Sequence, residues 1–387
     1  MKDLRDTKTL ITDVDRRKAL PIIRTLGEKG VKIIGIASHK MSLGSFSRYC
    51  AKVYICVDYK KNPIRFLEQF VDIVKIEQPD SLFPLEDEII ELLLQNIEMW
   101  NKYTKALLPS LENFTQAYDK WKTIQLAKEI GIRVPESYLP GTDEDINSIA
   151  ANASFRLIIK PRKSSGSRGL VFLDCNSELL SQYKEVSKKY AAPIIQERIP
   201  EGGKGYGVFT LFDDNMQLRA VFGHKRLREY PISGGPSTLR MSYQDKALIE
   251  QSVALARRMK LVGVAMFEYK ENCPNNEKVL MEINPRFWGS LQLAIFSGIN
   301  FPLLYHQILT GNDPQNQFSF EEGNLCRWLL PGDILHFLMN KNRFRMEPSF
   351  FDFFNKKQTY DIESLRDPMP MFGIIWEGIR KLLHGNK

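Results

Sequence analysis

The chain has 387 residues, of which 43% are hydrophobic and 26% are charged, and its formal net charge is +8. This length predicts two or three domains, and the composition is that of a globular chain rather than a disordered or membrane-spanning one. The N-terminal residues lack the long apolar run of a secretory signal, so we expect a cytoplasmic protein.

The cysteines and the positive charge narrow the classes of function. The five cysteines are scattered and never spaced CxxC, which disfavours a disulfide framework and a zinc site. A positive charge suits nucleic acid, an anionic membrane or an anionic small substrate. Because the sequence has neither a nucleic-acid-binding motif nor a basic stripe interleaved with aromatic residues, we predict no nucleic-acid partner.

Residues 1–108 alternate between strand and helix patterns. Strands are predicted at 9–14, 31–37, 52–58 and 80–85, and helices at 16–30, 63–78 and 86–100. This alternation predicts a doubly wound parallel α/β domain. The turn after the first strand reads ITDVDRRKA and lacks the GxGxxG of a dinucleotide site, so we place no nucleotide in this domain.

The rest of the chain mixes strands and helices less regularly. A helix is predicted at 113–131 and a linker at 132–142. A strand-rich α+β unit then runs to the helix at 290–298, and residues 313–387 follow as a C-terminal extension. We therefore expect a second, larger unit after the α/β domain.

The stretch MEINPRFWG at 281–289 carries the strongest chemical signal. Side chains alternate along a strand, so Glu282 and Asn284 share a face. If residues 271–278 form a hairpin loop centred near Asn275, Glu268 lies opposite Glu282 with Cβ atoms roughly 5 Å apart. Facing carboxylates are destabilising without a cation between them, and carboxylate and amide oxygens are ligands that Mg²⁺ uses beside phosphates. A surface strand pair with ordinary acids is the simpler alternative.

A phosphate site is the second signal. Lys160 ends the predicted strand 156–160, and Pro161 stops the ladder beyond it. The loop 163–169 holds two glycines and three serines, which allow backbone N–H groups and hydroxyls to approach phosphate oxygens. A mobile hairpin turn explains the same loop equally well, and the loop is not a Walker A motif.

A basic block follows at 224–240. His224, Lys225, Arg226, Arg228 and Arg240 surround a glycine pair, which suits an anionic substrate or a developing phosphoryl charge. A solvated charged face is the competing interpretation. We expect His224 to be a hydrogen-bonding neighbour, since no second histidine or cysteine stands at metal-ligand spacing.

Taken in order, these features resemble the ATP-grasp superfamily. The resemblance covers about residues 8–311 and rests on Lys120 after an aspartate, Lys160 before a glycine/serine loop, the QE pair at 196–197, Glu268, and ExNPR at 282–286. The first unit looks like the domain that precedes the grasp in carbamoyl-phosphate-synthase-like and carboxylate–amine ligase members. The resemblance implies three parts: a pre-grasp domain at 1–108, an ATP-grasp domain at 109–312 with a mobile small lobe at about 135–200, and the extension at 313–387.

The resemblance also implies roles for individual residues. The phosphates of ATP would contact Lys120, Lys160, Ser164, Ser165 and Gly166. Gln196, Glu197 and Ile199 would line the adenine, and Glu201 is the candidate for the ribose. Glu268, Glu282 and Asn284 would hold Mg²⁺, with Mn²⁺ as a substitute. The catalytic set would be Arg286, which faces the transferred phosphate, with Lys160, Arg226 and Arg240.

The activity implied is that of an ADP-forming ligase. ATP would phosphorylate a carboxylate to an acyl phosphate, which an amine then attacks. Two alternatives stay open: carbamoyl-phosphate-type chemistry on bicarbonate, and a non-catalytic ATP-binding regulatory or scaffold protein. The small-molecule acceptors would be chosen by the 224–240 block and by Glu86 and Asp87.

Two expectations concern association. A homodimer is compatible with the sequence, which leaves the oligomeric state open. The segment 371–385 has an apolar face with Trp376 beside Arg380 and Lys381, which suits peripheral contact with an anionic membrane, although packing on the protein's own surface is favoured.

Overall fold

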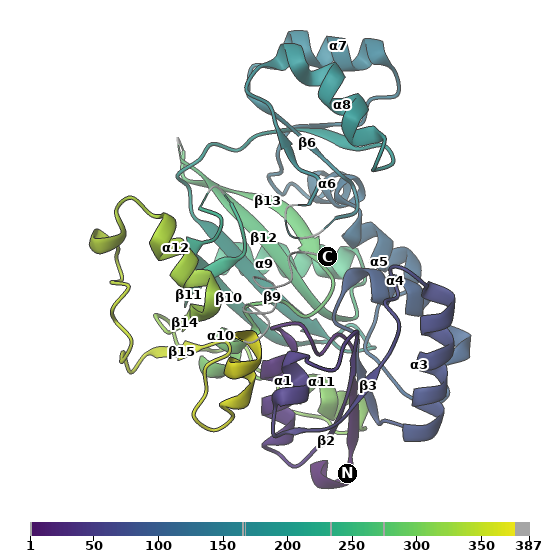
Figure 1. Cartoon of the computed structure of the whole chain (residues 1–387). Helices are drawn as coiled ribbons and strands as arrows, with labels where there is room; N and C mark the ends of the chain where they lie inside the picture. Colours follow the sequence, from purple (N-terminus) through teal and green to yellow (C-terminus); the bar gives the residue numbers. More distant parts are fainter. Residues whose placement is uncertain (1, 165, 167, 233, 274, 376–387) are drawn as a thin grey trace.

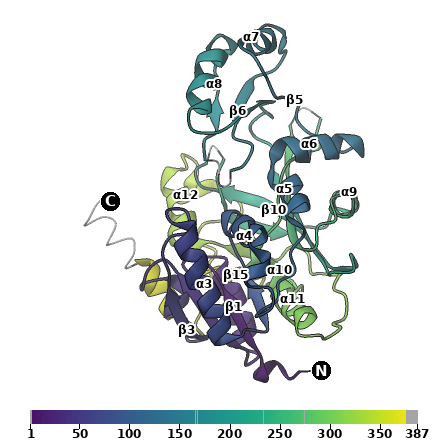
Figure 2. The ribbon, with the colours of Figure 1, turned by 90° about the vertical axis from the view of Figure 1, so that its right-hand side faces the viewer.

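The computed structural model describes residues 2–375 except 165, 167, 233 and 274. Within these residues the chain forms three sheets, which belong to an N-terminal α/β domain, a small lobe and a large mixed sheet (Figure 1). Figure 2 shows the small lobe standing apart from the other two parts. No helix in the described portion is long and apolar enough to cross a bilayer. The predicted fold class is confirmed.

The N-terminal domain is a parallel sheet in the order β3-β2-β1-β4. Its strands are β1 Lys8–Ile11, β2 Lys32–Ala37, β3 Cys50–Ile55 and β4 Ser81–Phe83, and its helices are α1 Ala19–Gly27, α2 Leu43–Phe46, α3 Pro63–Glu77 and α4 Asp87–Gln95. The chain winds outward from β1 to β3 and then places β4 on the other side of β1, which is the doubly wound arrangement. Asn62 caps α3 by accepting a hydrogen bond from the Arg65 N–H.

The connection to the small lobe differs from the single helix predicted at 113–131. The structure has two helices, α5 Leu111–Tyr118 and α6 Lys120–Glu129. Asp119 leaves the helical conformation between them, and its carboxylate accepts a hydrogen bond from the Trp121 N–H. Aspartate competes with the helix through its own side chain, so it ends one helix and caps the next. As a result Lys120 lies in the first turn of α6.

The small lobe is an antiparallel sheet in the order β5-β8-β6-β7, covered by helices. The strands are β5 Ser137–Tyr138, β6 Leu157–Lys160, β7 Val171–Phe172 and β8 Ile194–Glu197, and the helices are α7 Asp143–Asn152 and α8 Leu179–Ser187. Thr142 and Asp145 form a capping box that begins α7. The lobe has its own core, in which Leu157, Ile159 and Ile195 are fully buried.

The large sheet has the order β13-β12-β9-β10-β11-β14-β15. Its strands are β9 Gly205–Phe212, β10 Leu218–Glu229, β11 Ser237–Ser242, β12 Gly263–Asn272, β13 Glu277–Asn284, β14 Leu325–Arg327 and β15 Gln358–Tyr360. Helix α9 (Lys246–Arg258) packs on one face of the sheet, where its Leu255 shares a core with Phe212 of β9. Helices α10 (Leu291–Phe296) and α11 (Phe301–Leu309) lie on the other face.

The N-terminal domain and the large sheet share one hydrophobic core. Ile11 and Phe83 of the first domain belong to the same buried cluster as Phe209 and Trp288 of the second unit. The Phe83 ring lies 4.5 Å from the Tyr305 ring, centroid to centroid. The predicted boundary at residue 108 therefore separates two sheets but not two cores.

The C-terminal extension is part of the large sheet. Strands β14 and β15 continue the sheet beyond β11. Asp361 follows β15 and contacts Arg240 of β11 and, at 2.8 Å, Arg17 of the N-terminal domain. In the segment 371–385, Met371 and Ile374 pack against Leu43 of α2, while residues 376–385 lie outside the described part of the chain.

Candidate active site

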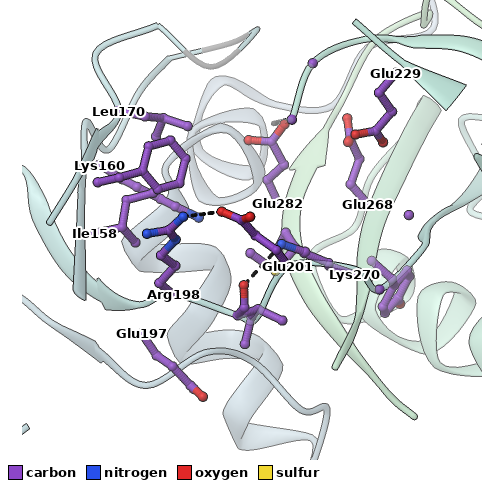
Figure 3. A pocket seen from close by; sticks show the side chains of 18 of the residues that line it. Ile158, Lys160, Leu170, Glu197, Arg198, Glu201, Glu229, Glu268, Lys270 and Glu282 are labelled. Atoms are coloured by element: carbon purple, nitrogen blue, oxygen red, sulfur yellow. Dashed lines mark hydrogen bonds and ion pairs between the residues drawn. The ribbon is translucent and has the colours of Figure 1, made fainter. Parts of the chain in front are cut away.

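A cavity of about 230 Å³ lies between the small lobe and the large sheet. The small lobe contributes Ile158, Lys160 and Phe172 to its wall. Strands β10, β12 and β13 supply the opposite wall, and the segment after β8 closes one side. Figure 3 shows Glu268 and Glu282 projecting from neighbouring strands into this space, with Lys160 and Leu170 across from them. Residues far apart in sequence thus meet at one site.

The acidic centre of the cavity lies on the β12–β13 hairpin. Glu268 pairs directly with Glu282 in the antiparallel register, as predicted for a hairpin centred near Asn275. Closer to the hairpin loop the register shifts by one residue, because Tyr269 faces Leu280 and Met281 is an extra residue on β13. Such an insertion is a β-bulge.

The bulge changes which side chains reach the cavity. Met281 and Glu282 both line it, although adjacent residues of a regular strand point to opposite faces. Leu280 and Ile283, on either side of them, are both buried in the core beneath the sheet. The bulge therefore gives the cavity two neighbouring side chains without removing an apolar residue from the core.

Cationic side chains neutralise the two carboxylates. Arg226 of β10 forms an ion pair with Glu268, and the Nζ of Lys120 lies 3.2 Å from Oε2 of Glu282. Burial raises the pKa of Glu268 despite Arg226, and the facing charge of Glu282 adds to this rise. Burial would also raise the pKa of Glu282, but Lys120, Asn284 and Lys160 together lower it below the ordinary value. Glu282 is thus held ionised.

Asn284 links the two carboxylates. Its Nδ2 donates hydrogen bonds to Oε1 of Glu268 at 3.1 Å and to Oε1 of Glu282 at 3.3 Å. Its Oδ1 accepts a hydrogen bond from Nη2 of Arg286 at 3.0 Å. In this arrangement the amide presents its NH₂ group to the acids, so a turn of the amide about its terminal bond would be required before its oxygen could serve as a ligand.

The donor set fits a magnesium ion that also binds phosphate. Among the described residues, no three His, Cys, Asp or Glu side chains gather as a metal cluster. Two facing carboxylates and an amide leave most coordination positions to other oxygens, as Mg²⁺ does when it keeps waters and substrate phosphates. The residues present therefore fit the predicted ion, and Glu268 and Glu282 are the side chains that could hold it.

Two lysines approach the acids from the small lobe side. Lys120 is buried in the first turn of α6, and its Nζ donates a hydrogen bond to the Ser164 carbonyl at 2.7 Å. Lys160 is buried at the end of β6, and burial lowers its pKa to about 8 against the opposing attraction of Glu282. Both ammonium groups lie where a polyphosphate would need positive charge.

The glycine/serine loop is only partly described. Ser164 lines the cavity, and Gly166 adopts a left-handed backbone conformation with a φ of 64°. Ser165 lies outside the described residues. Lys163 pairs with Glu91 of α4 at 2.6 Å, and Arg168 pairs with Glu88 at 3.1 Å. The loop therefore contacts the N-terminal domain across the site.

Only some of the residues predicted to line the adenine, in β8 and just after it, reach the cavity. Glu197 and Ile199 line the cavity, and the Ile199 carbonyl accepts a hydrogen bond from Lys270 at 3.1 Å. Gln196 is buried away from it, with its amide nitrogen 2.8 Å from the Ser137 hydroxyl. Glu201 lines the cavity and pairs with Arg198. Gln196 thus orders the small lobe through its side chain.

Sequence reasoning missed several lining residues. Lys270 stands two residues after Glu268 on the same strand, so strand alternation predicts that both share a face. Met281 and Phe172 give the wall its apolar surface, and Arg198 lies across from Lys270 (Figure 3). Met281 carried no local signal, because a regular strand would turn it away.

Within the basic block, only Arg226 of the two predicted catalytic arginines reaches the cavity. Arg240 is a correction: it is fully buried on β11, where it pairs with Asp361, which follows β15, and contacts Cys326 of the neighbouring β14. Its charge is neutralised inside the fold and is not available to a substrate. The expectation for His224 was also wrong, since both ring nitrogens lack a hydrogen-bond partner among the described residues and the ring packs against Phe209.

Arg286 lies beside the acidic centre rather than in the cavity wall. Its Nε lies 2.7 Å from Oδ2 of the fully buried Asp87, at the start of α4. The adjacent Glu86 pairs with Lys18 at 3.2 Å. Both acids predicted to choose the acceptor are therefore engaged in ion pairs, and Asp87 positions Arg286 next to Asn284.

The chain is similar in sequence to known proteins. A family model described as "ATP-grasp in the biosynthetic pathway with Ter operon" matches residues 211–329. The carbamoyl phosphate synthase large chain, C-terminal section, of Aquifex aeolicus is 24% identical over 249 residues, which cover 62% of this chain and 45% of that relative. A matching carbamoyl phosphate synthase large chain of Caldanaerobacter subterraneus is covered over only 26% of its length, so the chain spans less than half of these curated relatives.

Solved structures share the fold at low sequence identity. The biotin carboxylase–beta-gamma-ATP complex from Campylobacter jejuni has a TM-score of 0.69 at 16% identity, over 84% of this chain and 75% of that one. The L-amino acid ligase from Bacillus licheniformis has a TM-score of 0.58 at 15% identity, over 79% of this chain and 74% of that one. The chain thus has the fold of these solved structures, with an α/β domain ahead of a two-lobed unit, and its residues 211–329 are similar to an ATP-grasp family.

Proposed function

We propose that the protein is an ADP-forming ligase that uses Mg²⁺ and ATP to activate a carboxylate and join it to an amine. The observation that carries this proposal is the direct pairing of Glu268 with Glu282 on the wall of the cavity, with Lys120 and Lys160 beside them. Such a set binds a polyphosphate and its cation and has no protein nucleophile, which suits phosphoryl transfer between bound substrates.

The proposed reaction has two steps, phosphorylation of the carboxylate and attack by the amine. A carboxylate oxygen of the acceptor attacks the γ-phosphorus, the bond from that phosphorus to the ADP oxygen breaks, and an acyl phosphate forms. Lys120, Lys160 and Arg226 balance the negative charge of the phosphates. The amine then attacks the acyl carbon, phosphate leaves, and the nitrogen loses a proton. A bound Mg²⁺ would neutralise phosphate charge beside Glu268 and Glu282.

A second candidate is bicarbonate as the phosphate acceptor. It is favoured by the names of the curated relatives, which are carbamoyl phosphate synthase large chains. The chain spans less than half of those relatives, so amide formation with a larger carboxylate stays the first proposal. A non-catalytic ATP-binding role is the third, and the complete set of acids and lysines at the cavity weighs against it.

Measuring ADP release distinguishes these functions. The protein with Mg·ATP is incubated with pools of carboxylates, with or without pools of amines, and separately with bicarbonate. Release that needs a carboxylate, together with a hydroxamate when hydroxylamine replaces the amine, supports the ligase. Release with bicarbonate alone supports the second candidate. Binding of Mg·ATP without turnover in every pool would overturn both enzyme proposals.

The proposal extends to the setting of the enzyme. A cytoplasmic location and a homodimer remain predictions, which cell fractionation and light scattering after size-exclusion chromatography test directly.

A further inference from the structure

The stretch from the last residues of α12 (Ile334–Met339) to β15 exposes an unusual amount of apolar surface. It projects from the large sheet at the left edge of Figure 1. Five large apolar side chains in it are 57% to 96% exposed: Leu338, Met339, Phe344, Phe351 and Phe354. Single exposed apolar residues are ordinary, but a group of this kind marks an interaction site.

The exposed rings rest on a packed foundation. Phe337 lies beneath them, with ring centroids 5.5 Å from Phe344 and 5.6 Å from Phe351. Phe337 also packs at 4.3 Å on the buried Phe350, over which the guanidinium of Arg327 lies at 4.5 Å. Phe344 and Phe351 are therefore held by a fixed cluster, beside which Phe354 lies open to solvent.

Positive charge surrounds these rings. Five cations and two acids fall in residues 337–357, which gives the segment a net charge of +3. The cations are Lys341, Arg343, Arg345, Lys356 and Lys357, and all five are exposed. None of them forms an ion pair with another residue that the structure describes. Phe337, Phe344 and Phe351 lie apart in the sequence, and the fold brings their rings into contact.

The combination of exposed rings and unpaired cations fits one kind of surface. Phenylalanine inserts at the boundary between lipid headgroups and acyl chains, while lysine and arginine remain at the level of the phosphates. Cores of protein interfaces are depleted in lysine, and three of the five cations are lysines. A second copy of the chain would bring two positive segments together.

We propose that residues 337–357 form a docking surface for membranes that contain anionic phospholipids. This site differs from the segment 371–385, whose described residues Met371 and Ile374 pack on the protein itself. The docking surface is joined to the cavity through β10: Arg228 donates a hydrogen bond to the Pro348 carbonyl at 2.9 Å, and the His336 ring lies 2.7 Å from the Glu229 carbonyl. The proposal does not depend on the ligase activity.

Co-sedimentation with vesicles tests it. The full chain should sediment with vesicles of phosphatidylcholine mixed with phosphatidylglycerol, should not do so with phosphatidylcholine alone, and should be released by salt. Arg343→Gln combined with Arg345→Gln should weaken binding about fivefold for each cation lost. Phe354→Ala should weaken it about tenfold through the lost insertion of its ring. Phe354 makes no ring contact among the described residues, so this variant leaves the fold intact.

Matched variants far from the segment serve as controls. Lys29→Gln with Lys32→Gln removes the same charge from another exposed site, and Ile64→Ala removes an apolar side chain that is 75% exposed. Both should bind vesicles like the wild type. Absence of binding to anionic vesicles at low salt, equal binding to neutral vesicles, or equal losses in the controls would each overturn the proposal. So would a wild-type dimer that Phe354→Ala converts to a monomer without any vesicle binding.

Discussion

Glu282 connects the hairpin, the lysines and the bridging amide. Glu282→Gln keeps the volume and an oxygen that can accept from Lys120, so we expect the apo protein to melt within a few degrees of wild type. Turnover in the ADP-release assay should fall at least about 100-fold, the order seen when a charged group at a transition state is lost. Glu277→Gln, on the exposed part of the same strand, should keep activity. A large loss of thermal stability in Glu282→Gln would show that the residue is structural instead.

The contact of Lys160 with a bound polyphosphate can be tested by measuring proton uptake. Its pKa of about 8 in the free protein should rise when a polyphosphate binds, because the anion favours the charged form. Calorimetry near pH 8 in buffers of different ionisation enthalpy should therefore show uptake of about half a proton with ATP. ATP affinity should fall as the pH rises above 8. Lys160→Met should abolish the uptake, and uptake unchanged in that variant would assign the proton to another group.

For individual residues, the prediction that the two acids and the two lysines lie at one site is confirmed. The prediction that Arg240 reaches the same site is wrong. Alternation places Glu282 and Asn284 on one face, and the predicted hairpin centre near Asn275 places Glu282 opposite Glu268 on the adjacent strand. The environment of Arg240 depends on Asp361, 121 residues away in the chain. No local sequence pattern indicates a contact between residues so far apart in the chain. The sequence therefore does not distinguish a buried arginine from an exposed one.

Among the elements, α4 links the N-terminal domain to the site. Asp87 holds Arg286, while Glu88, the next residue, and Glu91, one turn further along the helix, pair with Arg168 and Lys163 of the glycine/serine loop. The strand and helix patterns predicted α4, but nothing in them indicated that its acids reach across to another lobe.

The contact between α4 and the loop has a measurable effect. In the variant Glu88→Gln with Glu91→Gln, trypsin should cut after Lys163 or Arg168 faster by roughly 2- to 30-fold, since each partly exposed ion pair contributes about 0.2–1 kcal/mol. Glu68→Gln breaks an exposed pair with Arg65 on α3 and should leave the cleavage rate unchanged. Equal rates in both variants would mean that the acids do not hold the loop.

For the whole molecule, the small lobe is set apart by its own core, whereas the N-terminal domain and the large sheet share theirs. The predicted division at residue 108 follows the change of sheet type. A shared core cannot be read from composition, because Phe83 and Tyr305 are apolar in either arrangement.

Asp361 joins the C-terminal extension to the large sheet and to the N-terminal domain. Asp361→Asn leaves Arg240 and Arg17 without their charge partner, and the free energy of unfolding should fall by about 3–5 kcal/mol. Burial opposes ionisation, but these arginines lower the pKa of Asp361 below its ordinary value of 3.8. Its stabilising contribution is therefore present above pH 4 and is lost as the pH falls through the lowered value.

Chemical denaturation over a range of pH checks this effect. Asp143→Asn, which breaks an exposed pair with Lys184, should cost less than about 1 kcal/mol. A similar small cost for Asp361→Asn would mean that the buried pair adds no stability.

The bulge at Met281 makes β13 tolerant of one particular deletion. Without Met281, Leu280 would still face Tyr269, Glu282 would still face Glu268, and every other side chain would keep its side of the sheet. Loss of any other single residue between the hairpin loop and Glu282 would instead move the residues between the gap and Glu282 to the opposite side of the sheet. In a deletion scan of this hairpin, loss of residue 281 should preserve the Glu268–Glu282 pair and remove only one apolar side chain from the cavity wall. Natural variation in the length of the hairpin should be tolerated at the same position.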